Sequence, residues 1–356
     1  DFVGGIAVNA LGYGDEGLNK AVNKVVESGL LHCSNLYYNN VAVQAAKQLC
    51  NLAEMDRVFF CNSGAEANEA ALKLARKFGH RSTHPRTEII SMVHSFHGRT
   101  YGAITATGQE KYHKGFSPLM QGISYAQFNN LESVQKLVNE NTCAIIVEPI
   151  QGEGGIVPAE KTFLKGLRDL CDEHDLLLIY DEVQCGMGRS GKPFAHQAYR
   201  VKPDVLTAAK ALAGGIPAGA MLTQGKANDV FAPGDHASTF GGNALAMAGV
   251  VEMTNRLSES SFTDHVQKMG EYLRNELEKF VTKYPTLCAS VRGMGLINGL
   301  VLKVPPRTVV DACFASGLLV IGAGSDVLRF VPPLIVQKQD IDKAVAIVDE
   351  ALATLT

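Results

Sequence analysis

The chain has 356 residues, of which 46% are apolar and 19% are charged, and its formal net charge is −3. This nearly balanced charge excludes a strongly basic nucleic-acid binder or a membrane-surface protein. No apolar run approaches the roughly 20 residues that a membrane-spanning helix needs, so we expect no such segment. Because a single core stops growing near about 250–300 residues, the length predicts two domains.

Eight cysteines are scattered along the chain without a CxxC pair. Structural zinc sites need closely spaced ligand pairs, and disulfide frameworks belong to short secreted chains. We therefore expect reduced thiols, most of them buried as small apolar side chains.

Short apolar runs alternate with longer amphipathic stretches, which predicts an α/β fold with a mostly parallel sheet. Residues 57–64 read as a strand that runs into a turn, and residues 65–78 as a helix with acidic residues early and basic residues late. Further buried strands are predicted at 87–93, 143–149, 176–183 and 204–210, with a helix at 163–175. Because ligands of such sheets bind at the carboxyl ends of strands, the residues there are the first candidates for chemistry.

The pattern changes after about residue 255. A long charged amphipathic helix is predicted at 262–284, followed by a glycine-rich segment at 291–302 and a final helix at 338–355. We expect these residues to form a smaller α+β domain. The predicted division is an N-terminal segment at 1–32 that packs with the small domain, a large domain at 33–255 and the small domain at 256–356.

Lys210 ends the predicted strand 204–210 and is followed by the glycine-rich segment ALAGGIPAGA. Most lysines are solvated surface charges, but an apolar approach and a glycine-rich exit predict a buried amine. Burial disfavours the ammonium form, and an amine that loses its proton can attack a carbonyl. Lys210 is therefore a candidate nucleophile.

Asp181 and Glu182 end the predicted strand 176–183. A carboxylate at this point either caps the next turn or pairs with the ring nitrogen of a pyridine cofactor. In the second case it holds that nitrogen protonated, and the ring can then accept electrons from a carbanion. Gln184, three residues after Asp181, is placed to hydrogen-bond the phenolic oxygen of such a ring.

Two segments offer groups that bind phosphate. NSGAEANEA (62–70) begins a helix, where backbone N–H groups near Gly64 and the Ser63 hydroxyl can hold an anion, although an ordinary turn has the same pattern. HASTFGGN (236–243) offers the Ser238 and Thr239 hydroxyls beside two glycines.

HSFHGRT (94–100) places Phe96 and His97 where a flat ring could stack. Its HxxH spacing raises the alternative of a zinc site, but no Glu follows the first His as in helical metalloproteases, so we expect no metal. Arg99 and Arg329 are each able to hold a substrate carboxylate through two hydrogen bonds, although structural ion pairs are the commoner role of arginine. Glu153, in EPIQGEGG, is a candidate partner for one of them.

Together, six segments resemble those of the class III (subgroup II) pyridoxal-phosphate aminotransferases of fold type I: DEVQCGMGRSG, AKALAGGIPAGA, NSGAEANEA, SFHGRT, EPIQGEGG and HASTFGGN. The resemblance covers essentially the whole chain, and HCSNLYYN (32–39) is similar to the acetylornithine-specific branch of the family. It implies a large, mostly parallel sheet domain covered by helices, together with a smaller α+β domain. It also implies transamination of N2-acetylornithine with 2-oxoglutarate, which gives N-acetylglutamate 5-semialdehyde and glutamate in arginine biosynthesis.

The resemblance assigns roles to individual residues. Lys210 and Asp181 become the catalytic residues, with Lys210 carrying the cofactor covalently and shuttling protons. The implied residues that bind pyridoxal phosphate are Ser63, Gly64, Ala65, Phe96, Asp181, Val183, Gln184, Lys210 and Thr239.

The implied substrate residues are Arg99, Glu153, Ser238 and Arg329. Glu153 resembles a switch that neutralises Arg329 when the incoming amino donor presents no carboxylate there. Thr239 is expected to reach the phosphate of a neighbouring subunit, so the resemblance implies a homodimer with shared active sites.

Other functions remain open from the sequence. Ornithine δ-aminotransferases look to carry a gating tyrosine where this chain has Ile6, and that difference favours an acetylated substrate. Succinylornithine and 4-aminobutyrate are further possible donors. A catalytically silent homologue that binds a small ligand is the alternative from another class.

The compartment follows from the source of the chain. FFCNSG, HPRTE, DEVQCG and VDAC are similar to plant and algal versions, which would place the protein in a mitochondrion or plastid, whereas a bacterial version would be cytoplasmic. The opening DFVGGIAVNALG is typical of the middle of an ordered segment. We therefore expect a natural N-terminus, with any targeting peptide, to precede Asp1.

Overall fold

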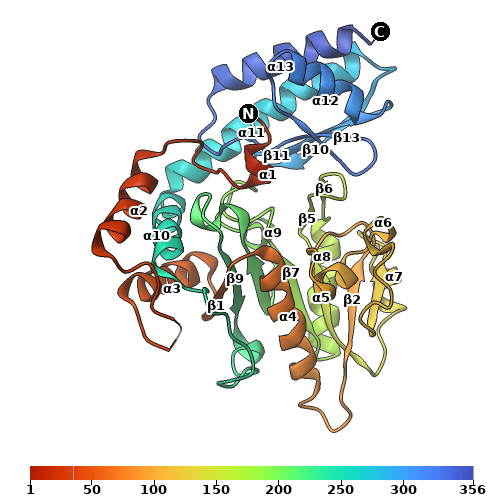
Figure 1. Cartoon of the computed structure of the whole chain (residues 1–356). Coiled ribbons are helices and arrows are strands. Elements are labelled where there is room, and N and C mark those ends of the chain that lie inside the picture. The colour runs from red at the N-terminus through yellow and green to blue at the C-terminus, as the bar shows by residue number, and fades with distance from the viewer. Residues whose placement is uncertain (35, 356) are drawn as a thin grey trace.

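A seven-stranded sheet forms the centre of the structure, a computed structural model that describes residues 1–34 and 36–355 (Figure 1). The strand order is β1-β9-β8-β7-β4-β2-β3, and every neighbouring pair is parallel except those of β9, which runs antiparallel to β1 and β8. The strands are β1 (Arg57–Cys61), β2 (Glu88–Met92), β3 (Ile123–Ala126), β4 (Thr142–Val147), β7 (Leu177–Asp181), β8 (Val205–Ala208) and β9 (Gly219–Thr223).

Helices cover both faces of this sheet. On β7, Leu177 and Ile179 pack with residues of α4 (Gly64–Gly79), whereas Leu178 and Tyr180 pack with residues of α8 (Lys161–Glu173). Successive side chains of a strand point to opposite faces, so the two helices lie on opposite sides. Strands covered on both faces read as continuous apolar runs, which is why the sequence pattern found them. The predicted fold class is confirmed.

The helix predicted at 65–78 is α4. Its N-cap is Ser63, whose hydroxyl accepts a hydrogen bond from the Glu66 N–H at 3.2 Å. Glu66 lies in its first turn and Arg76 and Lys77 lie in its last turn, as the helix dipole favours. This cap fixes the point at which the chain leaves β1 and enters the helix, above the carboxyl ends of the parallel strands.

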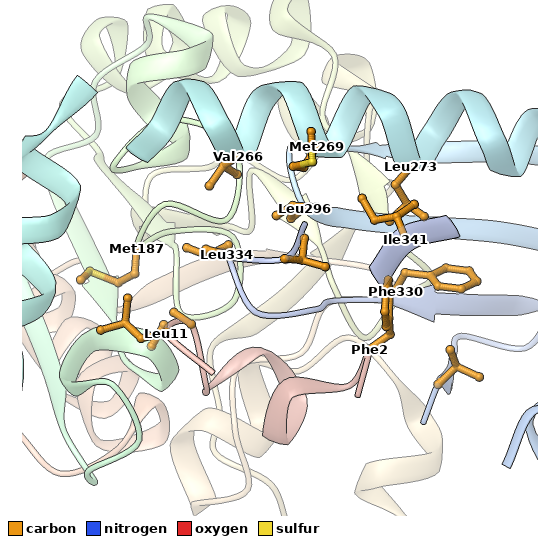
Figure 2. Packing of buried hydrophobic residues seen from close by; sticks show 14 of the residues in the cluster. Phe2, Leu11, Met187, Val266, Met269, Leu273, Leu296, Phe330, Leu334 and Ile341 are labelled. Atoms are coloured by element: carbon orange, nitrogen blue, oxygen red, sulfur yellow. The ribbon is translucent and has the colours of Figure 1, made fainter. Parts of the chain in front are cut away.

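A four-stranded antiparallel sheet forms the smaller lobe, in the order β10-β11-β13-β12. Its strands are β10 (Cys288–Met294), β11 (Ile297–Leu302), β12 (Ile321–Ala323) and β13 (Val327–Phe330). The helices α11 (Ser260–Lys283), α12 (Pro306–Ala315) and α13 (Lys338–Ala353) pack with it. Figure 2 shows the apolar residues of α11, including Met269 and Leu273, above Leu296, Phe330 and Ile341.

The N-terminal segment links the two lobes. The Phe2 N–H donates to the Leu319 carbonyl and the Val331 N–H donates to the Phe2 carbonyl, each at 2.8 Å. Farther along, the Leu334 N–H donates to the Ala10 carbonyl at 2.7 Å. The next helix, α2 (Glu16–Ser28), contacts α10 (Ala244–Ser258) beside the large sheet. This segment therefore joins the strand that carries Arg329 to the large lobe.

The remaining elements are short or lie at the periphery: α1 (Gly4–Ala7), α3 (Asn40–Ala53), α5 (Tyr101–Ala106), α6 (Glu110–His113), α7 (Leu131–Gln135), α9 (Ala195–Tyr199), β5 (Ile150–Gln151), β6 (Val157–Pro158) and the 3-10 turns η1 (Lys210–Ala213) and η2 (Gly225–Ala227). Within the described residues, no helix is long and apolar enough to cross a membrane.

Candidate active site

A cavity of about 480 Å³ lies between the carboxyl ends of the central strands and the N-terminus of α4. Nine of the residues predicted from the sequence line it, namely Ser63, Gly64, Ala65, Phe96, Arg99, Asp181, Val183, Gln184 and Lys210. These residues come from segments as distant as α4 and η1. They converge because parallel strands end at the same edge of the sheet.

Lys210 enters the cavity from the turn that follows β8. Its backbone has φ of 49°, in the left-handed region that is unfavourable for a side chain with a Cβ, and such strain concentrates at functional sites. Burial lowers the pKa of Lys210 to about 8. About a tenth of the amine is then unprotonated at pH 7 and about half at pH 8, so the neutral amine that a nucleophile or base requires is accessible.

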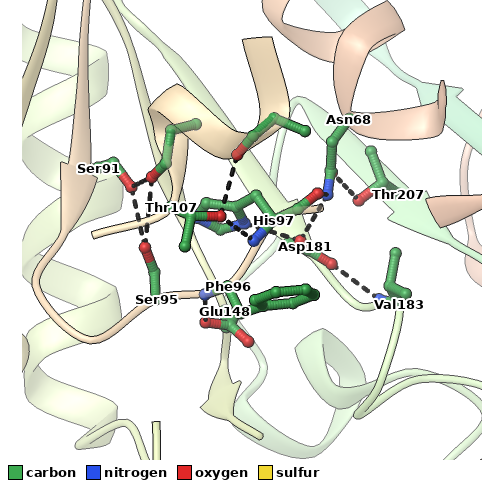
Figure 3. Close-up of polar contacts among 12 residues, drawn as sticks. Asn68, Ser91, Ser95, Phe96, His97, Thr107, Glu148, Asp181, Val183 and Thr207 are labelled. Atoms are coloured by element: carbon green, nitrogen blue, oxygen red, sulfur yellow. Dashed lines mark hydrogen bonds and ion pairs between the residues drawn. The ribbon is translucent and has the colours of Figure 1, made fainter. Parts of the chain in front are cut away.

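Asp181 is a buried carboxylate held by three hydrogen bonds (Figure 3). Its Oδ2 accepts from His97 Nδ1 and from Asn68 Nδ2, both at 2.7 Å, and its Oδ1 accepts from the Val183 N–H at 3.0 Å. The contact to Val183 is the turn cap that the sequence left open, and the carboxylate also lines the cavity. A buried carboxylate that is fixed by donors at both oxygens suits a partner for a protonated ring nitrogen.

Two further residues contact Asp181: His97, for which the sequence predicts stacking on a flat ring, and Asn68, which the sequence did not single out. The His97 side chain is fully buried, and its Nε2 has no hydrogen-bond partner among the described residues. Its Nδ1 therefore carries the proton that is donated to Asp181. A polar residue on the buried face of α4 was the available signal for Asn68.

The N-terminus of α4 faces the same cavity. The N–H groups of Gly64 and Ala65 have no partner among the described residues, as is usual for the first turn of a helix. A Cβ on Gly64 would lie 2.7 Å from Val183 Cγ1, so only glycine lets the backbone stay this close to the loop after β7. The Ser63 oxygen caps α4, which leaves its hydroxyl hydrogen free to donate. Free N–H groups at a helix N-terminus fit a phosphate.

Phe96 lines the cavity, and Glu148 holds its backbone. The Phe96 N–H donates to Glu148 Oε2 at 3.0 Å. Burial, reinforced by the nearby Asp181 charge, raises the pKa of Glu148 well above its usual value. Glu148 also lines the cavity but was not among the predicted site residues, although it lies within the predicted strand 143–149 and directly follows β4.

Glu153, Gln184 and Arg329 form one hydrogen-bonded group beside Lys210. Arg329 Nη1 lies 2.5 Å from Glu153 Oε1 and 3.0 Å from Gln184 Oε1, and Gln184 Nε2 donates to Glu153 Oε1 at 3.1 Å. Burial acts to raise the pKa of Glu153, but the charge and hydrogen bond of Arg329 lower it overall. The sequence placed Gln184 at the ring oxygen of the cofactor. Its amide joins the ion pair in this structure, and Gln184 also lines the cavity, so the contact with the ring oxygen stays a prediction.

Arg99 is exposed and rests on aromatic rings. Its guanidinium carbon lies 4.3 Å from the Tyr112 ring centroid and 5.6 Å from that of Phe96. Tyr112 also meets Phe96 edge to face, with 5.5 Å between the centroids. A guanidinium on a ring face gains cation–π stabilisation while its N–H groups stay free for a carboxylate.

Ser238 and Thr239 do not line the cavity that contains Lys210. They line a second cavity of about 390 Å³ with Asn62 and Glu66, and the Ser238 hydroxyl accepts from Asn62 Nδ2 at 3.2 Å. One chain therefore does not bring Thr239 and Lys210 together. The motif HCSNLYYN lies beside the same loop, where Asn39 Nδ2 donates to the Gly242 carbonyl at 3.2 Å, while its Asn35 is outside the described residues.

The alternative zinc reading of HxxH is not supported. His94 is exposed, and His97 donates a hydrogen bond to Asp181. The part of the chain that the structure describes contains no group of three or more His, Cys, Asp or Glu side chains that could hold a metal ion. All eight cysteines are free, and six are buried.

The site fits pyridoxal phosphate in its chemistry. A carboxylate for the ring nitrogen, an aromatic wall, an amine and free N–H groups for the phosphate surround one cavity. Each of these groups comes from a different segment, so the set does not arise from local pattern alone.

Comparison with known proteins agrees with this geometry. The family model for class-III aminotransferases matches residues 1–352. An acetylornithine aminotransferase of Clostridium acetobutylicum is 46% identical over 99% of this chain and 91% of its own length. The N-acetylornithine aminotransferase structure of Stenotrophomonas maltophilia is 36% identical, with a TM-score of 0.85 over 100% of this chain and 90% of that one.

A structure of the ornithine aminotransferase of Toxoplasma gondii, with partial occupancy of pyridoxal phosphate at the active site, is 29% identical. Its TM-score is 0.94 over 99% of this chain and 86% of that one. The resemblance found in the sequence is thus confirmed over the whole length. The chain belongs to the class-III aminotransferases, a family that works with pyridoxal phosphate.

Proposed function

We propose that this protein transfers the δ-amino group of N2-acetylornithine to 2-oxoglutarate, as a step of arginine biosynthesis. The observation that carries the proposal is the Glu153–Arg329 pair beside Lys210. One substrate brings a carboxylate and an acetylated amine at one end and a free amine at the other, whereas 2-oxoglutarate brings a carboxylate at both ends. A pair that closes and opens lets one cavity accept both. The full-length identity with acetylornithine aminotransferases supports the acetyl group.

Bound pyridoxal phosphate supplies an electron-withdrawing ring that stabilises the carbanion formed when the substrate loses a proton. Lys210 Nζ takes that proton from the substrate carbon that carries the amine and delivers it to the other end of the electron system that joins substrate and cofactor. Its lowered pKa makes both the neutral amine and the ammonium accessible. The Asp181 carboxylate keeps the ring nitrogen protonated, which increases the electron demand of the ring. The Gly64 and Ala65 N–H groups anchor the phosphate.

Arg99 holds the α-carboxylate of acetylornithine at the mouth of the cavity, supported by Tyr112. Glu153 meanwhile stays paired with Arg329, so no unpaired arginine faces the amine end of acetylornithine, an end that has no carboxylate. When 2-oxoglutarate enters, its second carboxylate replaces Glu153 on Arg329 through a bidentate contact. The same two arginines therefore serve both half-reactions.

Ornithine itself is the second candidate donor, because the ornithine aminotransferase structure has the higher TM-score. A TM-score compares backbones, and related enzymes with different substrates share a backbone. The substrate is decided by side chains at the mouth of the cavity. Ile6 lies in α1, two residues before Val8, which lines the cavity, and an apolar side chain offers nothing to a free α-ammonium group.

We also propose that two copies of the chain share their active sites. Exposed apolar side chains gather in the adjoining loops 32–39 and 236–243, where Leu36, Tyr37 and Tyr38 are 73% to 97% exposed and Phe240 is 60% exposed. Clustered apolar surface of this kind is typical of an obligate interface. A second copy placed there would bring its Thr239 to the phosphate.

We keep the division of the chain into residues 1–32, 33–255 and 256–356 as a proposal.

The substrate is tested by single-turnover mixing of the purified protein with acetylornithine, succinylornithine, ornithine and 4-aminobutyrate, followed through the absorbance of the bound cofactor. The proposal predicts the fastest change with acetylornithine. A preference for ornithine would overturn it. A colourless protein that takes up no added cofactor would instead support the silent homologue.

A further inference from the structure

Thr207 and Asn68 form a buried pair behind Asp181 (Figure 3). Thr207 lies on β8 and is completely buried, and Asn68 lies in the second turn of α4 and is 1% exposed. The Thr207 hydroxyl donates to Asn68 Oδ1 at 2.8 Å, and Asn68 Nδ2 donates to Asp181 Oδ2 at 2.7 Å. A chain of two hydrogen bonds thus connects a sheet residue to the proposed partner of the cofactor.

The direction of these hydrogen bonds is fixed by their chemistry. The amide nitrogen of Asn68 faces two acceptors, the Asp181 carboxylate and the His97 carbonyl at 2.7 Å. The amide oxygen therefore points the other way and needs a donor, and the Thr207 hydroxyl is the donor it meets. Without that hydroxyl, a buried oxygen loses its partner and the amide is held through its nitrogen only. A flipped amide would place an oxygen against the Asp181 carboxylate, which is repulsive.

Thr207 does not line the cavity, whereas Asn68 and Asp181 do. Its hydroxyl is therefore separated from the cofactor by two side chains. Asp181 is also held by the His97 ring at the same oxygen, Oδ2, and by the Val183 N–H at Oδ1, but neither of these contacts involves the amide oxygen of Asn68. Among the described residues, the Thr207 hydroxyl is the only hydrogen-bond donor to the amide oxygen of Asn68.

We infer that Thr207 is a positioning residue, which acts through Asn68 to keep the Asp181 carboxylate aligned for the ring nitrogen of the cofactor. This inference rests on the proposed role of Asp181. Since Thr207 is remote from any substrate, its hydroxyl affects how the cofactor is held and activated and leaves substrate binding nearly unchanged.

The test compares Thr207→Val, which has the same shape without the hydroxyl, with Thr207→Ser, which keeps the hydroxyl. The full chain is freed of cofactor, and the Kd of pyridoxal phosphate is measured by titration, alongside kcat and KM for acetylornithine. We expect Thr207→Val to raise this Kd and to lower kcat by about ten-fold each, with KM changed less than about two-fold. Thr207→Ser is expected to stay close to the wild type.

Equal behaviour of Thr207→Val and Thr207→Ser in both cofactor Kd and kcat would overturn the inference. If Thr207→Val does not fold, as checked by circular dichroism, Asn68→Asp tests the same step, because it turns an oxygen toward Asp181 and is expected to weaken the cofactor at least as much. Asp181→Asn is measured in parallel. A wild-type Kd and kcat for Asp181→Asn would show that the proposed role of Asp181 has failed. Because the Kd of the cofactor is measured without an amino donor, an error in the proposed substrate would leave this test unaffected.

Discussion

The guanidinium of Arg329 lies 2.5 Å from the carboxylate of Glu153, and the Arg329 side chain is 99% buried while that of Glu153 is 22% exposed. A buried cation without its partner is costly, so whichever carboxylate is present is drawn to Arg329. Glu153 can move because it is partly exposed, whereas Arg329 is fixed in β13. This asymmetry gives the pair its proposed role as a switch between substrates.

Glu153→Gln should weaken that switch. The neutral amide leaves the Arg329 charge uncompensated, so donors that present a carboxylate to it gain affinity. We expect the preference for the δ-amino over the α-amino group of ornithine to fall by about ten-fold, as measured by product analysis. Glu160→Gln, a change at an exposed helix cap, serves as the control. An unchanged preference would contradict the switch.

Tyr112→Leu should loosen Arg99. It removes the ring that lies 4.3 Å from the guanidinium and the edge contact to Phe96. Such contacts contribute about 0.5–1 kcal/mol each, so we expect KM for acetylornithine and for 2-oxoglutarate to rise about five-fold to thirty-fold, with a smaller change in kcat. Tyr112→Phe keeps the ring and should behave as the wild type. The same KM for the Leu and Phe variants would rule out support by the ring.

Lys210→Met should stabilise the cofactor-free protein at neutral pH. Burial lowers the pKa of Lys210 to about 8 in the folded chain, whereas the unfolded chain keeps a value near 10.5. Below pH 8 both states are protonated and the buried charge destabilises the fold fully. Between pH 8 and 10.5 the unfolded state binds more protons, so the wild type regains stability as the pH rises.

We therefore expect the free energy of unfolding in urea to be higher for Lys210→Met by about 1–3 kcal/mol at pH 7, and the gap to shrink by pH 10. Lys47→Met, at an exposed position on α3, should show no such pH dependence. A gap that is absent at pH 7, or that widens toward pH 10, would contradict a buried lysine.

Shared active sites predict complementation between inactive variants. Lys210→Ala removes the reactive amine, and Thr239→Glu places a negative charge against the phosphate of the neighbouring copy. A mixture that is unfolded and refolded together should recover roughly a quarter of the wild-type activity, because half of the dimers are mixed and each has one intact site. The separately refolded variants are the control. No recovery in a mixture whose mass is dimeric would exclude sharing through Thr239.

Site residues that lie at the ends of strands or helices could be predicted from local sequence, whereas residues that depend on packing between distant elements could not. Asp181, Lys210 and Gly64 were predictable because each ends a strand or begins a helix, and parallel strands end at one edge of the sheet. Thr207 and Asn68 interrupt apolar runs, but their pairing depends on how α4 lies across β8, which no local pattern specifies. Gln184 shows the same limit, because its contact with Arg329 joins positions 145 residues apart.

The most direct test of the account follows the nitrogen itself. The protein, loaded with pyridoxal phosphate, is incubated with 2-oxoglutarate and N2-acetylornithine that carries ¹⁵N at the δ-amine, and the products are analysed by mass spectrometry. The account predicts ¹⁵N-glutamate together with unlabelled N-acetylglutamate 5-semialdehyde. Glutamate without the label, or label transfer from ornithine but not from its acetylated form, would contradict it.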